Sequence, residues 1–166
     1  ALVKEEQRLL AVRRSQEVQN AKSLADIEKL KVIRDDEAQS LQDRIKANEE
    51  IGAIEKQRVE SAISLAEAEL NATRRNMQLK GRSTELLDLE KEKLIEIQEL
   101  RSENAGIENE QIVNNTALRK EQFDKEVQLI DAKRDLDAIL EEDAVKLADA
   151  VVKAEEDKIL KLKELG

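Results

Sequence analysis

Apolar residues recur along this chain at intervals of three and four positions, which is the spacing of one helix face and not the alternation of a strand. Nothing in the first segment interrupts that spacing, and the sequence contains no proline. The pattern therefore predicts a first long helix over about residues 2–35. Its apolar positions are Leu9, Leu10, Val12, Leu24, Ile27, Leu30 and Ile33.

An acidic stretch that begins at Asp35 follows this first segment, and a helix-start signal comes directly after it. Ser40 stands three residues before Asp43, which is close to a capping box, in which the serine oxygen accepts a hydrogen bond from the backbone N–H three residues on. The reciprocal residue of such a box is Glu or Gln, so Asp43 makes it an imperfect one. We interpret residues 35–40 as a break between two helices; the alternative is a solvated acidic stretch within one continuous helix.

A second helix is predicted over residues 41–80, and a sharp reversal follows it. Gly52 lies inside the segment, but one glycine costs only about 1 kcal/mol relative to alanine and need not end a helix. Beyond the segment, Gly81 can adopt the left-handed conformation of a helix C-terminus, and Ser83 and Thr84 can cap a new helix. The seam positions of this second helix, at steps of four and three, are Val59, Ile63, Ala66, Leu70, Thr73 and Met77.

The third segment, residues 84–165, carries polar residues within its repeating stripe. Asn104, Gln111 and Asn114 fall on the seam if the helix is continuous, where such residues cost stability and can set register and oligomeric state. Equally, residues 104–106 and 114–116 can be loops or new helix caps. The stripe in question is Ile97, Leu100, Asn104, Ile107, Gln111, Asn114 and Leu118, and a further one follows at Val145, Ala148, Val152, Ile159 and Leu162.

These signals predict an all-α protein built as a long antiparallel helical hairpin, a coiled coil of three legs at about residues 2–35, 41–80 and 84–165. The chain opens with Ala1 and ends in mid-pattern at Gly166. We therefore expect residues 1–166 to be a single coiled-coil segment of a longer protein. The far part of the third leg has no predicted partner within the chain. It is expected to pack on another copy, so that the protein self-associates, or on sequence outside this segment.

Composition agrees with long helices and limits the partners. Charged residues make up 40% of the chain and aromatic residues 1%, so the core must be thin and aliphatic. Disorder is the competing interpretation at this charge content, but apolar residues still reach 40% and recur with helical spacing. A net charge of −9 without a basic face argues against nucleic acid and against an anionic membrane surface. No apolar run approaches the roughly 20 residues that span a bilayer.

The sequence offers few residues suited to catalysis. The sequence lacks histidine and cysteine, which excludes the commonest general base, thiolate nucleophiles and typical zinc sites. Carboxylates are frequent, as in Glu141-Glu142-Asp143, but neighbouring positions do not share a helix face. No calcium loop and no phosphate-binding glycine loop is present. We expect a protein that is not an enzyme and binds no cofactor, metal or small molecule.

Two stretches nevertheless resemble a known family. VIRDDEAQSLQDRIKANEEIGAIEKQ and AISLAEAELNATRRNMQLKGRSTELLDLEKEKLIEIQELRSENAGIENEQIVN are similar to the coiled-coil part of tail tape measure proteins of Bacteroidetes-type phages and prophages. The likeness covers roughly residues 1–125, and the chain lacks the long hydrophobic region and terminal domains of whole family members. The residues that match the family's acidic stretch and helix restart are Asp35, Asp36, Glu37, Ser40, Leu41, Arg44, Ile45, Ala47 and Glu49.

The resemblance implies a structural protein that lies in the lumen of the tail tube and sets tail length while tube subunits polymerise around it. Its partners would be other copies of itself and tail tube or assembly proteins. It would be found in the bacterial cytoplasm during assembly and afterwards in the virion tail. The competing hypothesis is a helical-hairpin interaction module or a stalk of a bacterial protein, which would be monomeric until its partner arrives.

Overall fold

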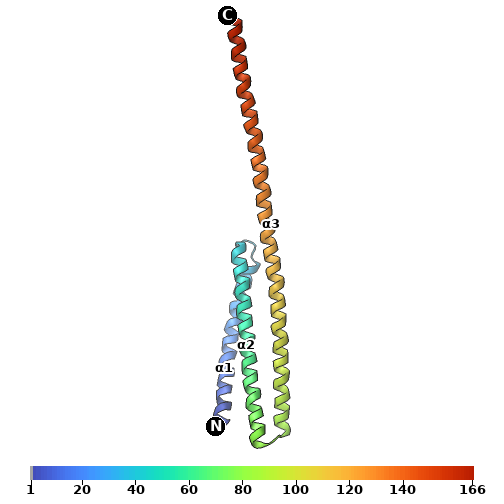
Figure 1. The fold of residues 1–166 in the computed structure, drawn as a ribbon. Coiled ribbons are helices and arrows are strands. Elements are labelled where there is room, and N and C mark those ends of the chain that lie inside the picture. Colours follow the sequence, from blue (N-terminus) through green and yellow to red (C-terminus); the bar gives the residue numbers. More distant parts are fainter. Residues whose placement is uncertain (1) are drawn as a thin grey trace. The chain divides into compact units, whose positions relative to one another are not determined.

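The computed structural model describes residues 2–166, which form three helices: α1 (Leu2–Asp35), α2 (Leu41–Lys80) and α3 (Thr84–Leu165) (Figure 1). Within that range there is no strand. Helices α1 and α2 pack antiparallel, and so do α2 and the first part of α3. The prediction of an all-α protein with three antiparallel legs is confirmed.

The reversal between α1 and α2 is a β-turn closed by an aspartate. The Gln39 backbone N–H donates to the Asp36 carbonyl oxygen at 3.0 Å, and the Ala38 N–H donates to Asp36 Oδ1 at 2.9 Å. Ser40 then precedes α2 in an extended conformation, and its Oγ accepts from the Asp43 N–H at 3.1 Å. The chain therefore turns between Asp35 and Leu41, and the alternative of one continuous helix through this stretch is wrong.

The reversal between α2 and α3 depends on a glycine. Gly81 has φ 91° and ψ 169°, a conformation that only glycine adopts without strain, and its N–H donates to the Met77 carbonyl oxygen at 3.0 Å. Its φ is positive, as expected, but its ψ is extended and lies outside the left-handed helical region. Ser83 Oγ then accepts from the Leu86 N–H at 3.2 Å, so Ser83 caps the helix that begins at Thr84.

Helix α3 runs without interruption through residues 104–106 and 114–116. Residues 104–106 and 114–116 are helical, so the interpretation of these stretches as loops or caps is wrong. Thr116 is accommodated because its hydroxyl donates to the Ile112 carbonyl oxygen at 2.7 Å, the usual partner of a mid-helix threonine.

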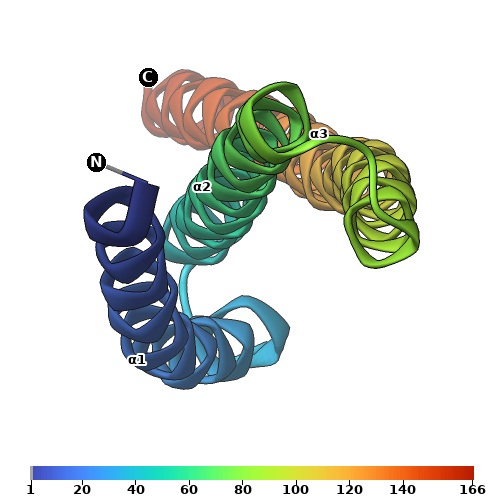
Figure 2. The ribbon, with the colours of Figure 1, turned by 90° about the horizontal axis from the view of Figure 1, so that it is seen from below.

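By its contacts the chain divides into two units, residues 1–119 and residues 120–166. In the first unit α2 lies between α1 and the first part of α3 (Figure 2). Because α2 has a neighbour on each side, it supplies most of the buried side chains, whereas Ile27 is the buried residue of α1. The buried apolar core consists of Ile27, Ala47, Ile51, Val59, Leu65, Ala66, Leu70, Ala72, Met77, Ile97 and Leu118.

The second unit, residues 120–166, is helical to Leu165, and its side chains are exposed except for the half-buried Glu121. Many of its exposed positions carry large aliphatic side chains, among them Leu129, Leu136, Leu140, Leu147, Val151 and Leu162. Among the described residues, no helix combines the length and the hydropathy that a membrane span requires.

Candidate functional site

An ion cluster joins all three helices. Arg13 of α1 donates to both carboxylate oxygens of Glu69 on α2, at 2.9 and 2.7 Å, and to Glu96 on α3 at 3.2 Å. Lys93 of α3 completes the cluster with contacts of 2.6 Å to Glu69 and to Glu96. We call Arg13, Glu69, Lys93 and Glu96 the three-helix ion cluster.

Glu69 is the centre of this cluster, with only 14% of its side chain exposed. Burial alone would raise the pKa of Glu69, but hydrogen bonds from Arg13 and Lys93 outweigh it and lower the pKa. The pKa of Glu96 is lowered by the same balance. Burial alone would lower the pKa of Lys93, but its hydrogen bonds to the two glutamates outweigh burial and raise it, and the hydrogen bond to Glu69 raises the pKa of Arg13. All four groups are therefore held in their charged forms, which suits a structural tie and not proton transfer.

Further contacts of α1 with α2 are also polar. Glu5 pairs with Arg75, and Glu6 accepts from the Asn76 amide at 2.9 Å. Near the opposite end of α1, the Arg44 guanidinium donates to the Arg34 carbonyl oxygen at 2.8 Å. Since α1 contributes one buried aliphatic residue, these charged and amide contacts carry much of its attachment.

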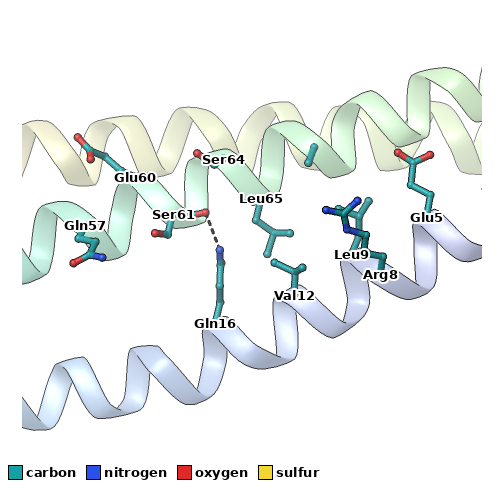
Figure 3. A pocket seen from close by; sticks show the side chains of 11 residues that line it. Glu5, Arg8, Leu9, Val12, Gln16, Gln57, Glu60, Ser61, Ser64 and Leu65 are labelled. Atoms are coloured by element: carbon teal, nitrogen blue, oxygen red, sulfur yellow. Dashed lines mark hydrogen bonds between the residues drawn. The ribbon is translucent and has the colours of Figure 1, made fainter.

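An open groove of about 580 Å³ runs between α1 and α2 (Figure 3). Val12 of α1 points towards Leu65 of α2 across it, and the Gln16 amide donates to the Ser61 carbonyl oxygen at 3.0 Å. The lining combines aliphatic side chains with amides, hydroxyls and a few surface charges. Such a lining can seat an apolar side chain.

A polar layer joins α2 to α3 at the level of Gly52. The buried Asn48 donates to Asn115 Oδ1 at 3.2 Å. With its amide oriented to satisfy both ends, Gln111 donates to the Asn48 carbonyl oxygen at 3.0 Å and faces the Gly52 N–H at 3.3 Å. A Cβ atom on Gly52 would lie 2.7 Å from Gln111 Cδ, so the glycine permits this close approach of the two helices.

The predicted polar seam residues Asn104, Gln111 and Asn114 are all half-buried on the face of α3 that also carries the buried Ile97 and Leu118. Of the three, Gln111 belongs to the polar layer, while Asn104 has a buried Oδ1 atom without a hydrogen-bond partner.

Several residues of the polar layer and of the three-helix ion cluster were not predicted from the sequence. Asn48 had no distinguishing signal, because it is an isolated amide in a polar helix. Asn115 lies within residues 114–116, which the sequence singled out as a polar seam or a loop, but nothing in the sequence pairs it with Asn48. The three-helix ion cluster was equally hidden, since its four residues come from three helices whose register the sequence does not reveal. Gly52 did carry a signal, since an isolated glycine in a helical pattern often marks a close backbone approach.

Among the described residues, no group of three or more acidic side chains is arranged to hold a metal ion. The contacts above tie the three helices together. Comparison with protein-family models, with curated proteins and with solved structures finds no match for this chain.

Proposed function

We propose that this chain is a structural helical spacer of the tail tape measure kind. The observation that carries the proposal is the composition of the fold: helices of 34, 40 and 82 residues, joined by two short turns and held by a thin aliphatic core with polar ties. Length is the property that such helices deliver most directly, because each residue adds about 1.5 Å. The resemblance of residues 1–125 to tail tape measure proteins supplies the particular role.

The charge of the chain fits a role inside a tube. A net charge of −9 discourages adhesion to DNA and to acidic walls, since like charges repel. The protein would meet tail tube or assembly proteins in the bacterial cytoplasm and remain in the virion tail after assembly. No nucleic acid, membrane, cofactor or small molecule is part of this role.

Self-association belongs to the proposal and is supported by residues 120–165. A helix with exposed aliphatic positions at intervals of four and seven is marginal alone in water and gains stability when a second helix covers that face. Leu129, Leu136, Leu140, Leu147 and Val151 share one side of the helix by this spacing. We propose that another copy of the chain covers them.

The decisive experiment removes length and keeps the remaining apolar positions on one side of the helix. Deleting residues 124–141, about five helical turns, keeps the apolar positions in phase. In the virus or prophage that encodes the chain, each tail assembled on the shortened protein is expected to be about 27 Å shorter. Tail length is measured by electron microscopy.

A matched control keeps the length and changes only surface charge. Asp131→Asn with Asp135→Asn alters two exposed residues of the same stretch and is expected to leave tail length unchanged. Normal tails of unaltered length on the shortened chain would refute the tape measure role.

A helical-hairpin interaction module is the second candidate, favoured by the open groove between α1 and α2. Light scattering coupled to small-angle X-ray scattering separates the candidates. A module that waits for its partner is expected to be a monomer over the accessible concentration range, whereas the spacer is expected to form oligomers whose mass rises with concentration.

A further inference from the structure

The contacts between α1 and α2 are arranged almost symmetrically about Ser40. Glu5 pairs with Arg75, Arg13 with Glu69, and Gln16 with the backbone of Ser61, and in each pair the two residues stand nearly equally far before and after residue 40. Arg34 and Arg44 continue the same relation next to the turn. A hairpin of two helices joined at residue 40 has this register necessarily.

An exchanged dimer would have the same register between α1 and α2. If residues 36–40 became helical, α1 and α2 would form one continuous helix, and two such helices could cross antiparallel at residue 40. Every α1 residue would then meet the same α2 residue as before, but on the other copy. Arg13 of one copy would reach Glu69 and Glu96 of the other, so the three-helix ion cluster would form between chains.

We propose that α1 is exchanged between two copies of this chain by straightening of residues 36–40. The residue types of the segment permit a helix, because Asp36, Glu37, Ala38, Gln39 and Ser40 include neither proline nor glycine. The contacts that hold α1 are largely polar and are remade in the exchanged dimer. The turn to α3 takes no part, since Gly81 fixes it separately.

What opposes exchange is the set of hydrogen bonds that close the turn. Asp36 accepts from the Ala38 N–H through its side chain and from the Gln39 N–H through its carbonyl oxygen, and Ser40 caps α2. These bonds favour the folded-back form in a single chain. Protein concentration favours the exchanged dimer, and hence the two forms are in a concentration-dependent balance.

The chain contains no cysteine, so single cysteines can report which chain α1 contacts. Full-length Gln16→Cys and Ser61→Cys chains are mixed, unfolded and refolded together, then treated with a short thiol cross-linker. Exchange is expected to give a cross-linked dimer from the mixture and none from either variant alone. Two copies of residue 16 would lie far apart, about 70 Å along the crossed helices.

A proline variant tests the straightened segment. Glu37 occupies the second position of the turn that Asp36 begins, where proline is well tolerated, whereas proline inside a continuous helix is strongly disfavoured. Glu37→Pro is expected to abolish the cross-linked dimer, and Glu37→Ala is expected to retain it. In the opposite direction, Asp36→Ala with Ser40→Ala is expected to lower the dimer dissociation constant at least about tenfold, since two turns open per dimer.

Three results would overturn the proposal. The first is a mixture that gives only monomers even with Asp36→Ala and Ser40→Ala. The second is a dimer in which residues 16 and 61 of different chains are not cross-linked, which is the result of association through residues 120–165 alone. The third is a cross-linked yield that is equal in the Glu37→Pro and Glu37→Ala chains.

Discussion

At the scale of single residues, Glu69 is a position where one substitution weakens contacts to two other helices, because both Arg13 of α1 and Lys93 of α3 donate to it. Glu69→Gln keeps the shape of the side chain but leaves two cations with a weaker acceptor. We expect the free energy of unfolding to fall by about 1–3 kcal/mol, measured by urea denaturation. The control is Glu67→Gln on the same helix, whose carboxylate is half exposed and meets Arg101 at 3.3 Å. A loss below about 0.5 kcal/mol is expected there, and equal losses at the two positions would contradict the cluster's role.

The same cluster makes stability depend on pH. The pKa values of Glu69 and Glu96 are lowered below the ordinary 4.5 by their cationic partners, after burial has acted in the other direction. Groups whose folded-state pKa is lowered stabilise the fold above the unfolded value, and that contribution is lost as the pH falls through the folded value. The unfolding midpoint is therefore expected to drop as the pH falls below 4.5. The drop in the unfolding midpoint should be smaller in Glu69→Gln than in the native chain. An equal drop in the two proteins would mean that other carboxylates cause the pH dependence.

Gly52 and Gln111 are expected to be energetically coupled. Gly52→Ala gains about 1 kcal/mol of helix propensity but displaces the Gln111 amide, since a Cβ would lie 2.7 Å from its Cδ. Alone, the substitution is expected to be nearly neutral. In a Gln111→Ala background it is expected to stabilise by about 1 kcal/mol, because no amide remains to be displaced. A double-mutant cycle measures the coupling, and strict additivity would contradict the close approach.

At the scale of the elements, two glycines are expected to respond in opposite ways to the same substitution. Gly81→Ala places a side chain at φ 91° and should destabilise by about 1–2 kcal/mol. Gly106→Ala lies within α3, where a Cβ meets nothing within 4 Å, and should stabilise by about 0.5–1 kcal/mol. Thermal unfolding of the two variants beside the native chain measures both. The same sign at both positions would contradict the assignment of the turn and the continuous helix.

The elements are also the level at which sequence reasoning succeeds. Asp36, Ser40 and Gly81 act on their immediate neighbours, so their short-range hydrogen bonds and conformations can be anticipated from local order alone. Whether Asn104 and Asn114 interrupt α3 was undecidable locally, because asparagine suits both a cap and a polar seam. Packing settled it, since the stripe from Ile97 to Leu118 lies against α2. The three-helix ion cluster depends on the register between helices, and in a chain with 40% charged residues many pairings look equally good.

At the scale of the whole molecule, α1 is held largely by charged and amide contacts and α2 by aliphatic burial. We therefore expect salt to destabilise the packing of α1 more than the core of α2. Charged contacts near the surface weaken as ionic strength rises, whereas aliphatic burial does not. Raising the salt concentration from about 0.05 M to about 0.5 M is expected to accelerate amide hydrogen exchange several-fold in residues 2–35. Exchange around Ile51, Val59 and Ala66, which are fully buried in α2, is expected to stay unchanged and serves as the internal control. Uniform acceleration along both helices would contradict the charge-held attachment.

The difference between the two reversals has a mechanical consequence. If the chain were pulled at Leu2, the contacts between α1 and α2 would break one after another. They are separate ion pairs and amide hydrogen bonds spread along the length of α1. The helix would peel progressively towards Asp36, at low force and with little loss of helical structure. Separation of α2 from α3 next to Gly81 would need a higher force, since it would expose the buried side chains of Leu70, Met77 and Ile97. A pulled chain would therefore lengthen in two separate steps, first a compliant one at α1 and then a stiff one at the α2–α3 hairpin.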